Sequence, residues 1–193
     1  MVTVFAGDPA SGAPAGTWDA AAGFATAGEA WRARRDEDRR ACIRLQAQPV
    51  WLPFPDSQYP VADRDDLSAA LVDAVRDAPT VIVPGHPLEH PDHVLVTTLA
   101  LEHCHPKVRL MLYAEQPYAW RRRGAATTPL VLADRLAAPV TWQRPRVGAA
   151  PRRRKRQAID CYRSQLRLFG RFVPMRLAAN DVRRGERVAE VVR

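Results

Sequence analysis

Short apolar runs alternate along the chain with segments whose apolar residues recur at helical spacing. The runs predict buried strands at 2–5, 50–52, 80–83 and 108–113. The intervening segments predict helices at 26–45, 66–78 and 92–102. In the clearest of these helices, Leu67, Leu71 and Val75 fall on one face. Because the strands are continuously apolar and alternate with helices, we expect an α/β fold with a mainly parallel sheet covered on both faces.

The pattern is weaker beyond residue 120. It predicts a short helix or connector at 129–136, a strand at 140–142 and a basic helix at 152–168. The last residues, 180–193, are charged, and we expect them to fray. No repeat or second domain is evident, so residues 1–193 are predicted to form a single domain. Residues 143–193 would be its basic, helical C-terminal segment.

Composition narrows the class of protein. No apolar run approaches the roughly 20 residues that a membrane span needs. The first twelve residues lack the basic start and the long apolar run of a signal peptide. The three cysteines, Cys42, Cys104 and Cys161, are far apart and odd in number. This pattern is typical of reduced thiols and predicts a cytoplasmic protein.

The formal net charge of +8 is unevenly distributed: 15 of the 29 basic residues lie after residue 140. Basic runs at 121–123 and 151–156 allow several interpretations. They could form a solvated face, attract an anionic substrate, or serve as the subunit interface of a homo-oligomer. Nucleic-acid binding is the least favoured, because no recognition module or aromatic stacking platform is evident.

Polar side chains gather in the loops that follow the predicted strands, where ligands bind in open α/β sheets. The densest group is His86, His90, Asp92 and His93. Imidazoles and a carboxylate at this spacing suit a zinc site or a general acid–base pair. The alternative is a helix-capping Asp92 beside surface histidines. One loop cannot complete a catalytic metal site, which generally takes three protein ligands.

Six segments, taken in order, resemble the LmbE-like, or PIG-L, zinc-dependent deacetylases. The central one is HPDH at 90–93, after a strand and a Gly/Pro turn. A second reads Arg-x-x-Glu-Asp-x-x-Ala-x-x-x-Leu from Arg34, although Gln46 stands where the family usually has glycine. The others are VTVFAGDP at the start, FPDSQY at 54–59, YAEQPYA at 113–119 and KRQAIDCYRSQ at 155–165.

The resemblance implies a Rossmann-like, three-layer α/β fold and a metal-dependent hydrolase. Such an enzyme removes the N-acetyl group of an N-acetylglucosamine-type conjugate with metal-activated water. The metal would be zinc or another divalent cation, with His93 as one ligand. His90 would polarise the carbonyl or stabilise the oxyanion, and Asp92 would tune it. Arg34, Asp56 and Tyr118 would line the substrate cleft.

Simpler interpretations stand beside these roles. Arg34 and Glu37 are spaced as an i,i+3 ion pair on a helix, and Tyr118 could be an ordinary aromatic at the edge of the core. Lys155, Tyr162 and Gln165 match the family pattern, and we expect them to have a packing role.

One departure from the family bears on activity. In the family, the first motif is His-Pro-Asp-Asp, which supplies two metal ligands and a general base. The present sequence does not contain this motif. We expect that the domain lacks its first βα unit, and that the 193-residue chain has weak zinc binding and no deacetylase activity. The alternatives are a catalytically inactive relative that acts as a binding protein, and a basic protein associated with nucleic acid.

Overall fold

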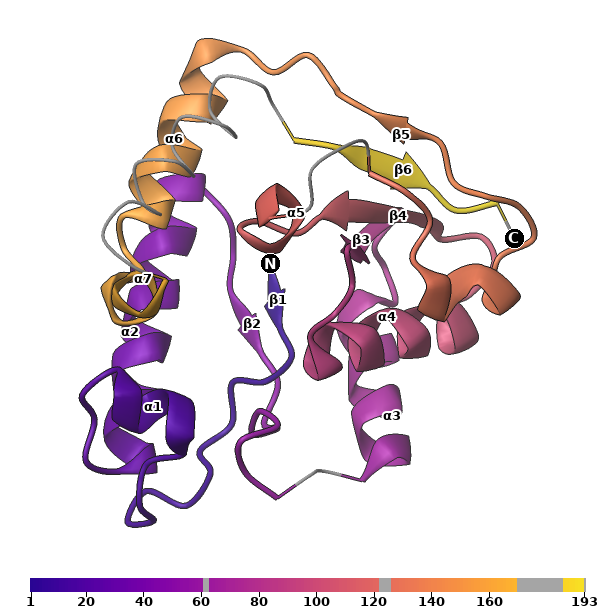
Figure 1. The fold of residues 1–193 in the computed structure, drawn as a ribbon. Coiled ribbons are helices and arrows are strands. Elements are labelled where there is room, and N and C mark those ends of the chain that lie inside the picture. Colours follow the sequence, from indigo (N-terminus) through magenta and orange to yellow (C-terminus); the bar gives the residue numbers. More distant parts are fainter. Residues whose placement is uncertain (61–62, 122–125, 170–185, 193) are drawn as a thin grey trace. The chain divides into compact units, whose positions relative to one another are not determined.

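The computed structural model describes residues 1–60, 63–121, 126–169 and 186–192 (Figure 1). It confirms the α/β class, and the chain divides into two compact units. The first unit comprises Met1–Asp63 and Val147–Arg184, and the second comprises Arg64–Arg146 and Gly185–Arg193. That residues 1–193 form one domain stays a prediction.

The first unit combines a two-stranded parallel sheet with helices. The strands are β1 (Val2–Thr3) and β2 (Val50–Trp51). The helices are α1 (Thr17–Ala21), α2 (Ala27–Leu45), α6 (Ala149–Ile159) and α7 (Arg163–Leu168). The predicted basic helix at 152–168 is therefore two helices, with a break between Ile159 and Arg163.

Helix α2 has the local signals that fix both of its ends. At its start, the Thr26 hydroxyl accepts a hydrogen bond from Glu29 N, and the Glu29 carboxylate accepts from Thr26 N, which is a capping box. At its end, Gln46 has a φ of 57°, in the left-handed region that favours glycine. Gln46 thus adopts the backbone conformation that explains why the family prefers glycine there.

Two buried carboxylates on α2 hold distant segments of the first unit together. Asp38 accepts hydrogen bonds from Thr3 Oγ1 at 3.2 Å, Trp51 Nε1 at 2.6 Å and Tyr162 Oη at 2.7 Å. Burial and this bond raise the pKa of the Tyr162 hydroxyl well above its usual range. The packing role expected for Tyr162 is therefore a hydrogen bond to Asp38.

The second carboxylate, Glu37, explains the break between α6 and α7. It accepts hydrogen bonds from Ser164 N at 2.8 Å and from Ser164 Oγ at 2.7 Å. Ser164 lies in the first turn of α7, whose backbone N–H groups have no partner within the helix. In a continuous helix, the Ser164 N–H would donate its hydrogen bond to a backbone carbonyl of the preceding turn. The hydrogen bond to Glu37 therefore requires that a new helix begins here.

The second unit is a mixed sheet with helices. Its strands are β3 (Thr80–His86), β4 (Arg109–Ala114), β5 (Trp142–Gln143) and β6 (Val188–Glu190). Its helices are α3 (Arg64–Val75), α4 (Pro91–His103), α5 (Tyr118–Arg121) and the 3-10 helix η1 (Leu130–Arg135). The strand order is β3-β4-β6-β5. Leu67, Leu99, Leu110, Leu112 and Leu132 are fully buried.

The sheet of the second unit is parallel only in part. Strands β3 and β4 are parallel, as predicted, whereas β6 is antiparallel to both β4 and β5. The expectation that 180–193 fray is wrong for Val188–Glu190, which is strand β6. Residues 180–185 and 193 lie outside the described residues. Tertiary pairing explains why Val188–Glu190 form a strand: β6 is hydrogen-bonded to two partner strands, and Glu190 forms an ion pair with Arg109 at 2.6 Å.

The structure describes one of the two basic runs completely and the other only in part. Residues 151–156 lie in α6. Arg121 ends α5, and Arg122 and Arg123 lie outside the described residues. Across the part of the chain that is described, no helix combines the length and the apolar composition needed to cross a bilayer.

The Asp38 cluster yields a stability prediction. Replacing Asp38 with alanine leaves three donors in a largely buried setting, so we expect the free energy of unfolding to fall by about 3 kcal/mol. Urea denaturation measures this loss. Asp36→Ala is the matched control, because its ion pairs with Arg39 and Arg40 are exposed and each contributes less than about 1 kcal/mol. Equal losses in the two variants would contradict the role given to Asp38.

Candidate active site

The HPDH segment forms the start of helix α4, and His90 is its N-cap residue. Pro91 occupies the first helical turn, where the missing N–H of proline costs nothing. His90 Nδ1 accepts a hydrogen bond from Asp92 N at 3.3 Å. Capping by Asp92 was one interpretation of the sequence and is wrong, because the imidazole of His90 takes the backbone N–H instead.

Asp92 is buried, with 8% of its surface exposed, and its carboxylate lies 3.8 Å from His90 Nδ1. Because Nδ1 of the neutral ring accepts a hydrogen bond, its proton is on Nε2. His90 can therefore donate a hydrogen bond from Nε2 in either protonation state.

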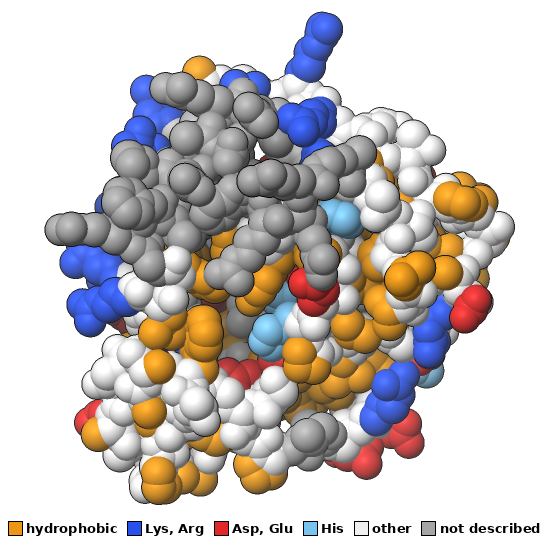
Figure 2. Space-filling model, viewed as in Figure 1, with side chains coloured by type: hydrophobic (Ala, Val, Ile, Leu, Met, Phe, Trp, Pro, Cys, Tyr) orange, Lys and Arg blue, Asp and Glu red, His pale blue; other side chains and the backbone are white. Residues whose placement is uncertain are grey.

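His93 lies one helical turn further on, and a buried glutamate supports it. Its Nδ1 is hydrogen-bonded to Oε2 of Glu115, a residue with 2% of its surface exposed. Glu115 follows Ala114, the last residue of β4, so the pair joins the end of that strand to the start of α4. The rings of His90 and His93 are 5.0 Å apart between centroids. Figure 2 shows histidine side chains at the surface, beside acidic and hydrophobic ones.

Tyr118 packs edge-on against His93, with 6.0 Å between ring centroids. It lies in the first turn of α5, three residues after Glu115. The second unit therefore brings together four of the predicted site residues: His90, Asp92, His93 and Tyr118. The imidazole of His93 has Glu115 at one nitrogen and Tyr118 at its side.

The described residues do not form a complete metal site. Within the described part of the chain, no three His, Cys, Asp or Glu side chains are grouped so that they could hold a metal ion. His93 has the surroundings typical of a zinc ligand, since ligating histidines often have a carboxylate on the other ring nitrogen. The residues present therefore fit one position of a zinc site and leave the others unassigned.

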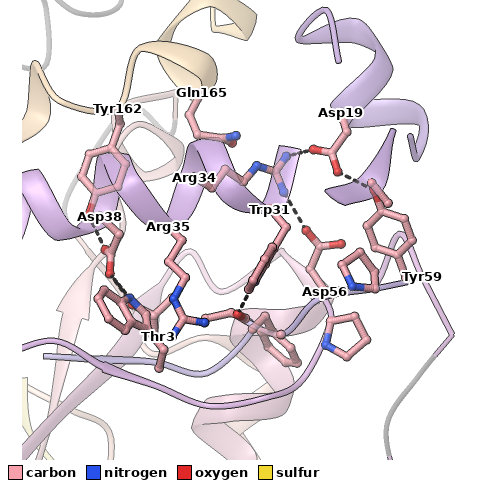
Figure 3. A pocket seen from close by; sticks show the side chains of 17 residues that line it. Thr3, Asp19, Trp31, Arg34, Arg35, Asp38, Asp56, Tyr59, Tyr162 and Gln165 are labelled. Carbon is pink, nitrogen blue, oxygen red and sulfur yellow. Dashed lines mark hydrogen bonds and ion pairs between the residues drawn. The ribbon is translucent and has the colours of Figure 1, made fainter. Parts of the chain in front are cut away.

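The other two predicted site residues, Arg34 and Asp56, meet in the first unit (Figure 3). The Arg34 guanidinium forms ion pairs with Asp56, at 3.0 Å, and with the buried Asp19. The alternative of an ion pair between Arg34 and Glu37 is wrong, because Glu37 is engaged by Ser164. Tyr59 Oη donates to Asp19 at 2.6 Å, and burial together with Asp19 raises the Tyr59 pKa.

These groups line a pocket of about 190 Å³. Its polar side is the cluster of Arg34, Asp19 and Asp56, and its apolar side includes Trp31, held by a hydrogen bond from its indole nitrogen to Ala6 O at 2.8 Å. Nε of Arg34 is buried and has no hydrogen-bond partner among the described residues. The pocket thus offers carboxylates, a guanidinium and an aromatic face, which suits a polyhydroxylated ring.

Three residues of these clusters were not identified from the sequence: Glu115, Asp19 and Tyr59. Glu115 could have been identified from the sequence, because this residue directly follows a predicted buried strand, at the edge of the sheet where ligands bind. Nothing local marks Asp19, whereas Tyr59 ends the FPDSQY segment at 54–59. They pair with each other across 40 positions of the chain.

Comparisons with known proteins agree with this description. Residues 1–104 match the PIG-L family, described as GlcNAc-PI de-N-acetylase. A deacetylase of the teicoplanin biosynthesis pathway is 25% identical, with a TM-score of 0.80 over 100% of this chain and 86% of that one. The zinc-inhibited form of teicoplanin deacetylase Orf2 is 25% identical, with a TM-score of 0.74 and coverages of 100% and 86%.

A third solved structure, the A40926 pseudoaglycone deacetylase Dbv21, supports the fold alone. It is 24% identical, with a TM-score of 0.77 over 100% of this chain and 84% of that chain. No curated protein matches the sequence.

His86, at the end of β3, gives a prediction about pH. Burial lowers its pKa below the ordinary 6.5, with a further decrease from Arg187 and opposing effects of Thr127 O, Glu115 and Glu89. The folded state therefore prefers neutral His86, while the unfolded state binds its proton near pH 6.5. This contribution to stability is complete above that pH and is lost as the pH falls through the lower, folded-state pKa.

We expect His86→Gln to reduce the slope of unfolding free energy against pH between about pH 6.5 and 4.5, above the range of ordinary carboxylates. Urea denaturation across that range measures the slope. His103→Gln is the control, because His103 is exposed. A slope unchanged by His86→Gln would contradict the assignment.

Proposed function

The chain belongs to the PIG-L family of de-N-acetylases, and from this premise we propose that it hydrolyses the N-acyl group of an amino-sugar conjugate. The observation that carries the proposal is the HPDH segment at the start of α4. There two imidazoles lie side by side, and each is held by a different partner. The solved structures most useful for comparison are themselves deacetylases.

Hydrolysis of an amide needs groups of opposite polarity close together. Water adds to the carbonyl carbon, negative charge develops on the carbonyl oxygen, and the C–N bond breaks to give a carboxylate and an amine. We assign to His90 the hydrogen bond that stabilises this oxygen, because Nε2 carries a proton. Asp92, whose carboxylate lies 3.8 Å from His90 Nδ1, would tune that donor through its negative charge.

Zinc or another divalent cation is the cofactor that the family implies. Bound, it would activate water and polarise the substrate carbonyl. Because the described residues hold no group of three donors, His93 is the one ligand that we assign. The support for this assignment is the carboxylate of Glu115 on its other nitrogen.

We propose that the pocket of the first unit binds a sugar ring. Arg34 and Asp56 would bind hydroxyl groups, and Trp31 would pack against a sugar ring. An N-acetylglucosamine-type conjugate fits this combination of groups. Tyr118, packed against His93, would limit where the acyl group can lie.

One observation favours a second candidate, a relative that binds acylated sugars without cleaving them. The described residues supply one suitable metal ligand, and the His-Pro-Asp-Asp motif is absent from the sequence. Binding and cleavage are separable by experiment, because the pocket of Arg34 and the histidines of α4 lie in different units.

The first test measures acetate release. Because the sequence lacks His-Pro-Asp-Asp, we expect the 193-residue chain to release no acetate from N-acetylglucosamine conjugates. A longer product that carries this motif, supplied with zinc or another divalent cation, should release acetate, and His93→Ala in that product should reduce the rate by at least 100-fold. The reduction follows because His93 would contact the reacting centre through the metal. His103→Ala is the control, since His103 is exposed and lies at the far end of the same helix.

Three results are distinguishable. Release that depends on His93 supports the deacetylase, and equal rates in the two variants would contradict it. Binding of the conjugate without release would replace it by the second candidate. Neither binding nor release would contradict both.

The second test measures binding of N-acetylglucosamine conjugates by calorimetry or NMR titration. We expect Asp56→Asn to weaken binding about tenfold, because hydrogen bonds to a charged group contribute roughly 1.5–3 kcal/mol. Asp73→Asn is the matched control, with a carboxylate that is exposed and pairs only with its helix neighbour Arg76 among the ion pairs described. Equal affinities for the two variants would remove Asp56 from the binding site.

A further inference from the structure

We infer that Glu115 is a positioning residue that sets the tautomer of His93. Its carboxylate fixes the ring proton on Nδ1, so that Nε2 presents a lone pair next to the Nε2–H donor of His90. Its place in catalysis rests on the proposed function, whereas the tautomer itself can be measured without substrate or metal.

The surroundings of Glu115 leave its carboxylate few partners. The residue is almost completely buried, and Oε1 accepts a hydrogen bond from Leu88 N at 2.9 Å. Oε2 bonds to His93 Nδ1. Among the ion pairs of the described residues, His93 is its only basic partner. A buried carboxylate needs donors, so the His93 proton is held where Glu115 can accept it.

Glu115 also holds the loop that leads into α4. Leu88 has a φ of 58°, a left-handed conformation that costs a branched residue roughly 1–2 kcal/mol. The hydrogen bond from Leu88 N to Glu115 helps to compensate for that cost. The backbone N–H of Glu115 also donates a hydrogen bond to His86 O at 2.7 Å, which connects the end of β4 to the end of β3. The same carboxylate thus fixes both the loop and the ring.

His90 shows the opposite arrangement in the same helical turn. Its Nδ1 accepts the N–H of Asp92, which puts the proton of the neutral ring on Nε2. Two histidines with centroids 5.0 Å apart therefore expose nitrogens of opposite polarity. One can donate to a developing oxyanion, and the other can accept a proton or bind a cation. The difference is set by their partners, a backbone N–H for His90 and a carboxylate for His93.

Imidazole ¹⁵N NMR tests this assignment directly, because it reports which ring nitrogen carries the proton. In the unmodified chain, at a pH where both rings are neutral, we expect His93 to be protonated on Nδ1 and His90 on Nε2. The key variant is Glu115→Gln, which keeps the size of the side chain. Its carbonyl oxygen can still accept from Leu88 N, which turns its NH₂ group toward His93.

In Glu115→Gln we expect the tautomer of His93 to switch to Nε2–H, while His90 stays unchanged as an internal standard. Glu102→Gln is the matched control. Glu102 lies on α4, 3.8 Å from His103 Nε2, but outside the buried cluster. Its replacement should leave His93 and His90 as they are. Where the deacetylase reaction is measurable, Glu115→Gln should lower its rate roughly 10–100-fold.

Several results would overturn the inference. The first is a proton on Nε2 of His93 in the unmodified chain, which decides the matter even if Glu115→Gln does not fold. The second is a folded Glu115→Gln chain in which the His93 tautomer is unchanged. If the tautomers are as expected but a longer product carrying His-Pro-Asp-Asp releases no acetate, Glu115 keeps its structural assignment and the proposed function fails. A purely structural glutamate would change stability without switching the tautomer.

Discussion

Burial of carboxylates is the constraint on which much of this structure depends. Five carboxylates are buried in the described part of the chain: Asp19, Glu37, Asp38, Asp92 and Glu115. Desolvation of an ionised group costs several kcal/mol unless donors replace the lost water. For Asp19, Glu37, Asp38 and Glu115 the donors come from distant parts of the chain, so satisfying the carboxylate also fixes the tertiary structure. Each of these four acids therefore joins segments that hydrophobic packing alone would orient less specifically.

In the first unit this constraint explains the spacing of three polar residues of α2 in physical terms. Arg34, Glu37 and Asp38 lie within two turns of one helix, yet each contacts a different segment. Arg34 pairs with Asp19 of α1 and with Asp56 after β2, Glu37 binds the start of α7, and Asp38 binds both strands and Tyr162. A helix carrying such a motif organises a pocket at one end and the packing of α7 at the other.

In the second unit the same constraint operates beside the histidines. The HPDH segment gives its first histidine to the helix start, where the N-cap position consumes one ring nitrogen. The second histidine meets Glu115 from the end of a neighbouring strand. The motif thus encodes two imidazoles with different partners. The partners differ because His90 is the N-cap of a helix, whereas His93 binds Glu115 at the carboxyl end of a strand.

The sequence by itself determined the main helices, the buried strands β3 and β4, and the loop that holds His90, Asp92 and His93. These follow from local periodicity and capping, which act over a few residues. It did not determine the break before α7, strand β6, the pairing of Arg34 with two aspartates, or the role of Glu115. Each of those depends on a partner 15 or more positions away, such as Glu37 for Ser164 and His93 for Glu115. Only the tertiary structure decides such partners, because a buried charge takes whichever donor the packing of the chain brings within reach.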